Sequence, residues 1–99
     1  MSTPTTDTAA MRQIIRALRA SGHTLRFVYD GEDDVPVANE TEALEAINAV
    51  DQAYLHVTLP DGETTGYVFF VLGNDPEEVA CDWTVNLPDV DRVTESWWS

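Results

Sequence analysis

The sequence contains no lysine, and its five basic residues are all arginines, against 18 acidic residues and a formal net charge of −13. Proteins bind a phosphate backbone largely through Lys and Arg side chains that displace counterions. Attraction to an anionic membrane surface depends on the same positive charges. We therefore expect neither direct binding to DNA or RNA nor binding to membranes.

Cysteine is nearly absent as well: Cys81 stands alone, so no disulfide can form within the chain. That usage is typical of a reducing compartment. No stretch approaches the roughly 20 apolar residues that a membrane span needs, and residues 1–8 lack the charged and apolar regions of a signal peptide. The sequence thus predicts a cytoplasmic protein.

Motifs that carry chemistry are also missing. There is no glycine-rich phosphate loop. His23, His56 and Cys81 are the only obvious nucleophile, base or soft-metal candidates, and they are too few for a zinc site unless carboxylates join them. One hypothesis is a small enzyme or ligand-binding site that uses Tyr54, His56 and Cys81. The main prediction has no catalytic residue, no metal and no cofactor.

The charge is unevenly distributed along the chain. Residues 1–29 carry four arginines and Asp7, a net of +3, whereas residues 30–99 carry 17 carboxylates and Arg92, a net of −16. Such a field favours a basic protein surface as partner, including a basic groove that normally holds nucleic acid. The alternative is that the acidity only keeps the protein soluble or reflects the composition of its host.

Hydrophobic periodicity predicts an α+β domain over residues 7–99, preceded by a disordered tail at residues 1–6. The expected fold is a small antiparallel sheet of three to four strands with two to three helices packed on it. The predicted helices span residues 7–21, 40–50 and 76–84, and residues 89–99 are expected to form a last amphipathic turn or two. The expected caps are Asp7 or Thr6 and Gly22 for the first helix, Asn39 for the second, and Asp75 followed by Pro76 for the third. The predicted strands span residues 24–29, 35–37, 53–59 and 67–72.

Alternation along two strands predicts which side chains share a face. In the first strand Leu25, Phe27 and Tyr29 are expected on one face, with Arg26 and Val28 on the other. In the strand at 53–59, the apolar positions face one way and the positions that face the other way are Tyr54, His56 and Thr58. Residues 67–72 are apolar at both alternating sets, which indicates a central strand.

The densest carboxylate cluster is the turn at residues 30–34. Its acidic positions have the 1-3-5 spacing of a calcium loop, but Val35 and Thr41 stand where that loop needs Gly and Glu. A solvated turn or a partner contact is therefore favoured over calcium. The acidic residues predicted to bind a partner are Asp30, Glu32, Asp33, Asp34, Glu40, Glu42, Asp75, Glu77, Glu78 and Asp82.

The tryptophans suggest a second kind of contact. Trp97 and Trp98 are adjacent, so one face of a helix or strand cannot bury both, and we expect one of them to be exposed. Both are included among the predicted partner-binding residues because tryptophan is enriched in interface hot spots, whereas Trp83 is expected in the core. The alternative function is a self-associating structural or accessory protein, such as a homodimer. It would use this segment and the arginine row of the first helix, Arg12, Arg16 and Arg19.

Residues 66–75, GYVFFVLGND, followed by CDWTVNL at residues 81–87, resemble a pattern in small uncharacterised phage and prophage proteins. The resemblance implies a mobile-element context. By size and charge the chain is also similar to small acidic phage proteins, which include DNA mimics and inhibitors of host defence. The predicted function is a non-enzymatic acidic binding protein, of the phage-inhibitor or nucleic-acid-mimic type, that engages a basic protein surface.

Overall fold

The structure is a computed structural model that describes residues 3–98. Within this range the chain forms three α-helices, a short 3-10 helix and an antiparallel sheet of five strands in the order β2-β1-β3-β4-β5. The α+β class predicted from the sequence is confirmed, with one strand more than the expected three to four. The elements are α1 (Asp7–Ala20), β1 (Thr24–Tyr29), β2 (Asp34–Pro36), α2 (Glu40–Asn48), β3 (Gln52–Thr58), β4 (Thr65–Val71), η1 (Pro76–Glu78), β5 (Ala80–Trp83) and α3 (Pro88–Trp98).

Helix α1 begins and ends where its capping residues predict. The Thr6 hydroxyl accepts a hydrogen bond from the Ala9 N–H at 3.0 Å, which satisfies one of the unpaired donors of the first turn. At the other end Gly22 has φ +94°, and the N–H of His23 donates to the Leu18 carbonyl at 3.0 Å. This is a Schellman motif, whose left-handed position favours glycine.

The start of α2 is also fixed by local hydrogen bonds. The side chain of Asn39 accepts from the Glu42 N–H at 2.9 Å, and the Glu42 carboxylate accepts from the Ala38 N–H at 2.8 Å. The arrangement is close to a capping box, except that the N–H that donates to the Glu42 carboxylate belongs to Ala38, one residue before the cap. The predicted cap is confirmed.

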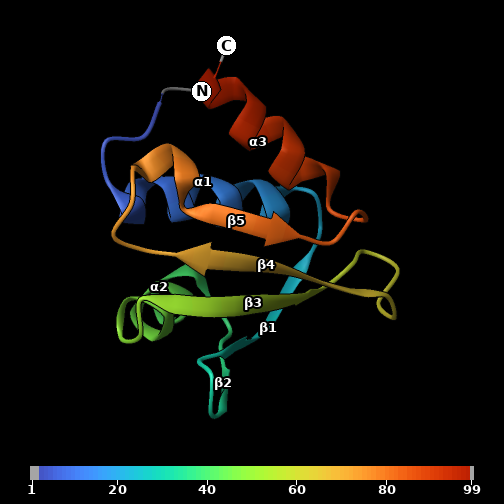
Figure 1. Cartoon of the computed structure of the whole chain (residues 1–99). Coiled ribbons are helices and arrows are strands. Elements are labelled where there is room, and N and C mark those ends of the chain that lie inside the picture. Colours follow the sequence, from blue (N-terminus) through green and yellow to red (C-terminus); the bar gives the residue numbers. More distant parts are fainter. Residues whose placement is uncertain (1–2, 99) are drawn as a thin grey trace.

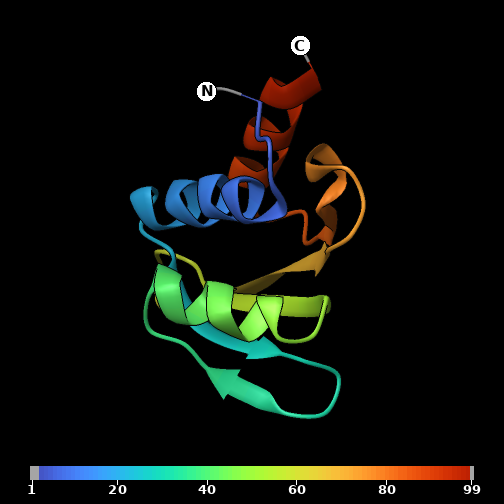
Figure 2. The ribbon, with the colours of Figure 1, turned by 90° about the vertical axis from the view of Figure 1, so that its left-hand side faces the viewer.

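Both long apolar stripes face the sheet from one side. In Figure 1 the strands lie in front of α1 and α2, and the turned view in Figure 2 shows α1 above α2, with α3 above α1. The core lies between these helices and the inner face of the sheet. Its largest fully buried side chains include Phe70, Met11, Ile14, Ile15, Leu18, Ile47, Leu55 and Leu87.

Helix α3 packs against α1 rather than on the sheet centre. Val90, Val93 and Trp97 are buried, as their spacing predicts, and the Trp97 indole N–H donates to the side-chain oxygen of Gln13 in α1 at 2.9 Å. The expected extension to Ser99 lies outside the described residues. No helix in the range 3–98 has the length and apolar character required to cross a bilayer.

The segment after β4 corrects a prediction. Residues 76–84 were expected to form one helix, but only Pro76–Glu78 is helical, and Ala80–Trp83 pairs with β4 as the fifth strand. Pairing satisfies the backbone groups along that side of β4, which a helix would leave unbonded. Tertiary context therefore overrides the local helix signal of Asp75-Pro76.

Strand β1 carries a second correction. The register shifts between Leu25 and Phe27, so Arg26 is an extra residue in a β-bulge. Leu25 and Val28 are buried, whereas Phe27 and Tyr29 lie on the other face. The predicted grouping of Leu25 with Phe27 and Tyr29 is wrong because the bulge reverses the alternation midway.

The start of the chain is held to the body from residue 4 onward. Pro4 is buried and Thr6 caps α1, although both fall in the predicted tail of residues 1–6. Residues 1–2 lie outside the described part. The predicted edge strand near Pro36 is observed as β2, one residue earlier than expected.

Gly66 in β4 is predicted to resist even a small side chain. A Cβ at this position would lie 2.7 Å from the Thr84 hydroxyl and 2.9 Å from the Asn86 side-chain oxygen. Gly66→Ala should lower the free energy of unfolding by about 1–3 kcal/mol in urea denaturation, because the strand and the 84–87 turn must move apart. Thr65→Ala, at the exposed neighbouring position, serves as control and should lower the free energy of unfolding by less than about 1 kcal/mol. Equal losses in the two variants would contradict the close approach of Gly66 to the side chains of Thr84 and Asn86.

Candidate functional site

A row of aligned side chains crosses the whole sheet on the face away from the helices. Strand register pairs Asp34 with Tyr29, Tyr29 with Tyr54, Tyr54 with Phe69, and Phe69 with Asp82. Directly paired residues of antiparallel strands point to the same face. The row therefore places three aromatic rings between two carboxylates, one on each edge strand.

A second row runs beside the first. It aligns Pro36, Phe27, His56 and Tyr67 across β2, β1, β3 and β4. The Phe27 and His56 rings stack with centroids 4.4 Å apart, and His56 and Tyr67 lie 5.9 Å apart. The guanidinium of Arg26 lies 5.3 Å from the centroid of the Phe27 ring, in cation–π geometry.

The two rows form one continuous aromatic surface. Tyr54 is its centre: its ring stacks on Phe69 at 4.5 Å and meets the edge of Tyr67 at 5.3 Å. No helix of the described residues lies over this surface, which faces the viewer in Figure 1. The rings shield one another and are half-buried, except for Tyr29, which is 37% exposed. We call this surface the open face, and it consists of Phe27, Tyr29, Tyr54, His56, Tyr67 and Phe69.

His56 is held as a neutral ring within the open face. Burial lowers the pKa of its imidazole below the ordinary 6.5; the Asp34 carboxylate opposes this and the Arg26 guanidinium adds to it. The neutral ring stacks on Phe27 as an aromatic partner. The environment therefore favours the uncharged form of the ring at neutral pH.

The acidic turn at residues 30–34 is organised by its first residue. The Asp30 carboxylate accepts from the N–H groups of Asp33 at 2.8 Å and Glu32 at 2.9 Å, and these bonds hold its pKa below the usual range. Glu32, Asp33 and Asp34 are exposed. Across residues 3–98, no group of three or more carboxylate, imidazole or thiol side chains is arranged to hold a metal ion.

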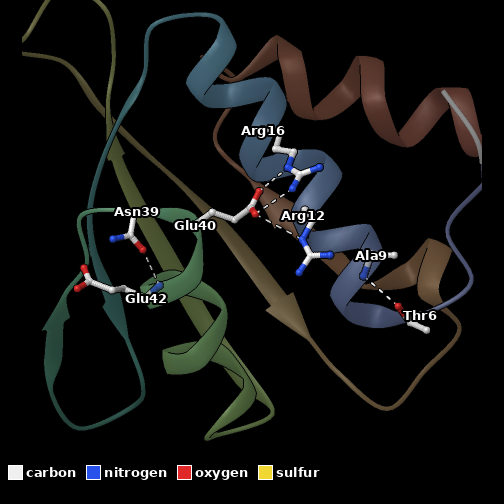
Figure 3. A network of polar contacts seen from close by, with 7 residues as sticks. All are labelled: Thr6, Ala9, Arg12, Arg16, Asn39, Glu40 and Glu42. Carbon is white, nitrogen blue, oxygen red and sulfur yellow. Dashed lines mark hydrogen bonds and ion pairs between the residues drawn. The ribbon is translucent and has the colours of Figure 1, made fainter.

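Glu40 links helix α2 to helix α1. Arg16 donates to its carboxylate from Nε at 2.7 Å and from a terminal nitrogen at 3.3 Å, and Arg12 Nε lies 3.4 Å away without hydrogen-bond geometry (Figure 3). Two of the three arginines of the α1 row are thus paired within the chain. The carboxylate of Glu42, beside it on α2, is bonded to backbone as described above.

The second acidic group lies at the opposite edge of the sheet. Asp75 directly precedes η1, and Glu78 is its last residue. Glu77 is half-buried, and Asp82 is exposed on β5. Asp82 also accepts from the N–H of Trp83 at 3.0 Å. Eight of the ten predicted partner-binding carboxylates are therefore divided between two edges with the open face between them, whereas Glu40 and Glu42 lie on α2 at the helix side and are engaged within the chain.

The tryptophans divide as predicted. Trp97 is buried at 5% exposure, whereas Trp98 is 67% exposed at the end of α3. Trp83 is half-buried against the core, and its indole N–H donates to the Asp91 carboxylate at 3.2 Å. The expected exposure of one residue of the pair is confirmed.

The nucleophile and base candidates are not brought together. His23 is buried, with Nδ1 3.1 Å from the Leu18 carbonyl oxygen and 4.0 Å from the carboxylate of Asp89, which pairs with Arg92. Cys81 falls in the segment that was expected to be a helix, but it is exposed on β5, because this segment forms an edge strand. Partial burial of the thiol and the nearby Glu78 carboxylate raise the pKa of Cys81.

Sequence reasoning named Tyr54 and His56 but did not recognise the open face. The missed signal is the coincidence of aromatic residues at alternating positions in three strands, with Tyr67 and Phe69 following the same period as Tyr54 and His56. Reading residues 67–72 as a strand covered on both faces hid this pattern. The bulge at Arg26 hid the contribution of β1.

Comparison with known proteins does not add a relative to this description. No protein-family model, no curated protein and no solved structure matches the chain. The resemblance of residues 66–87 to phage proteins therefore stays a prediction, and the candidate site is argued from geometry and charge.

The neutral state of His56 predicts a pH dependence. Because the folded-state pKa is lowered, the unfolded chain binds the proton more readily, so the free energy of unfolding should fall as the pH drops from about 7.5 to about 5. This contribution is complete above the unfolded pKa near 6.5 and is lost as the pH falls through the folded value. Urea denaturation of the wild type and of His56→Gln over this pH range measures the contribution of His56, because both proteins retain His23. An identical pH slope in the two proteins would contradict the neutral, packed imidazole.

Proposed function

We propose that the protein is a non-enzymatic binding protein whose open face engages a basic surface of a partner protein. The observation that carries the proposal is the row of three rings between Asp34 and Asp82. Exposed contiguous apolar surface framed by polar groups is typical of interaction sites. Here the framing groups are negative, so the complementary partner is positive.

The arrangement supports a cation-binding surface in two ways. Aromatic faces attract Arg and Lys side chains through the ring quadrupole, by about 0.5–2 kcal/mol each depending on desolvation. The carboxylates at both edges add attraction at long range, which raises the association rate for a basic partner. A net charge of −13 strengthens this steering.

The same features weigh against a nucleic acid on the open face. Aromatic sheet surfaces can stack bases, but such sites combine the rings with a positive groove that follows the phosphates. The edges here are carboxylates, and Arg26 is the one arginine placed at the open face. A protein surface that normally holds nucleic acid fits the charge, which is the form in which nucleic-acid mimicry enters this proposal.

Fluorescence anisotropy with short labelled probes tests the proposal. A peptide of arginine and serine should bind, and its affinity should fall as salt rises from about 0.05 to about 0.3 M, whereas an acidic peptide and single-stranded DNA should not bind. The double variant Asp34→Asn/Asp82→Asn should bind the basic peptide about tenfold more weakly than the wild type does, which corresponds to roughly 1.4 kcal/mol.

A matched control separates this surface from total charge. Glu45 on α2 and Glu95 on α3 are exposed on the helix side, so Glu45→Gln/Glu95→Gln removes the same two charges away from the open face. Its affinity should stay within about twofold of the wild type. Equal losses in the two double variants, or no binding of the basic peptide, would overturn the proposal.

Trp98 favours a second candidate, self-association through the end of α3. An indole that is 67% exposed is suited to an interface, although like charges of −13 oppose pairing of two copies. This candidate predicts that the wild type sediments as a dimer at high concentration and that Trp98→Ser, which leaves the buried Trp97 in place, sediments as a monomer. A monomeric wild type would eliminate it.

A further inference from the structure

One end of the open face is hollowed where β1 ends and β3 begins. The recess has a volume of about 560 Å³ and is open to solvent. Its aromatic walls are Tyr29, Tyr54 and Phe69, the three rings of the first row. Two carboxylate residues, Asp30 and Asp51, complete the lining together with Gly31, Val50 and Gln52.

The acidic residues of this hollow are held by the fold. Asp30 is fixed by its two backbone hydrogen bonds in the turn, and the Tyr29 hydroxyl donates to the Gly31 carbonyl at 3.1 Å, which draws the turn toward the ring. Asp51 has φ +65°, and its carbonyl accepts from the Leu72 N–H at 2.8 Å. Both carboxylates are therefore attached to backbone whose position beside the rings is set.

Rings and carboxylates together select a cation. An anion or a phosphate would meet the charges of Asp30 and Asp51, and a neutral apolar ligand would cover both negative charges without supplying an opposite one. A second copy of the chain would bring another charge of −13. A cationic side chain gains from the ring faces and from the carboxylates at once.

Among cations the guanidinium group fits best. It is planar, stacks on aromatic faces and can pair with a carboxylate through two hydrogen bonds, whereas an ammonium group is a compact and more strongly hydrated charge. The chain supplies an internal precedent on the same surface, because the Arg26 guanidinium lies over the Phe27 ring at 5.3 Å.

The arginines of the chain itself are engaged or placed elsewhere. Arg12 and Arg16 pair with Glu40, Arg92 pairs with Asp89, and Arg19 lines a recess on the helix side. None of them lines the hollow between β1 and β3. An arginine that fills it must come from another molecule.

We propose that this hollow receives an arginine side chain of the partner protein, with the guanidinium against the rings of Tyr54 and Phe69 and paired with Asp30 or Asp51. The inference rests on the proposed function and adds the ligand chemistry and the subsite. It distinguishes a specific arginine pocket from general attraction between opposite charges.

The test is an NMR titration of the ¹⁵N-labelled chain with three short peptides that differ at one residue type: arginine with serine, lysine with serine, and citrulline with serine. Citrulline keeps the shape of arginine without its charge. Amide shifts should concentrate at residues 29–31, 50–54 and 69. The arginine peptide should bind at least about threefold more tightly than the lysine peptide, and the citrulline peptide should not bind measurably.

Two substitutions probe the hollow without removing core packing. Asp51→Asn keeps a residue that tolerates the left-handed backbone, and Tyr29→Leu removes a partly exposed ring while it retains apolar volume. Each substitution should lower the affinity for the arginine peptide by about three- to tenfold. Glu45→Gln is the matched control and should leave the affinity for the arginine peptide unchanged. Unchanged amide spectra outside the hollow will show that the variants fold.

The outcomes separate the two proposals. Binding of the basic peptides with shifts away from the hollow, insensitivity to Asp51→Asn and Tyr29→Leu, or equal affinity for arginine and lysine would overturn the arginine pocket and leave the basic partner in place. Binding of no basic peptide would overturn both. Hollow shifts produced by single-stranded DNA, or by raising the concentration of the chain alone, would assign the hollow to another occupant and overturn the inference.

Discussion

The β-bulge at Arg26 is the constraint on which the open face depends. Without the extra residue, alternation from the buried Leu25 would turn Phe27 and Tyr29 toward the helices and Val28 outward. With it, β1 contributes a valine to the core and two rings to the opposite surface. Those rings then align with β3 and β4, and the three strands share one aromatic layer. A single local irregularity thus adds the two rings of β1 to the aromatic surface that β3 and β4 present on the face away from the helices.

Much of the fold follows from local signals in the sequence. Both ends of α1 and the start of α2 were predicted from capping residues, because each cap satisfies specific backbone groups. Asn39 and Gly22 were expected as caps and are observed as such, and of the two expected candidates at the start of α1, Asp7 and Thr6, the cap is Thr6. The strand at Ala80–Trp83 was missed for the opposite reason. Its stability comes from pairing with β4, a contact that no short window contains.

The site was predicted only in part, and the reason is also physical. Charge could be counted along the chain, and most of the acidic residues are exposed, but the gathering of eight predicted partner-binding carboxylates at the β2 and β5 edges is a property of strand order. The aromatic surface arises from register across three strands, which depends on the bulge and on the loop between residues 58 and 65. Composition therefore supports only the charge of the proposed partner, whereas the surface proposed to meet it follows from strand order and register.

The account's central claim is that aromatic rings and carboxylates of the open face act together on a positively charged partner. Exposed ion pairs alone contribute about 0–1 kcal/mol each, so a specific complex needs the rings as well. The most direct measurement is a set of intermolecular NOEs in the complex with an arginine peptide. The account predicts NOEs from the arginine Hδ protons to the ring protons of Tyr54 and Phe69. A saturated complex whose NOEs reach only the helices, with the open-face rings unaffected, would contradict it.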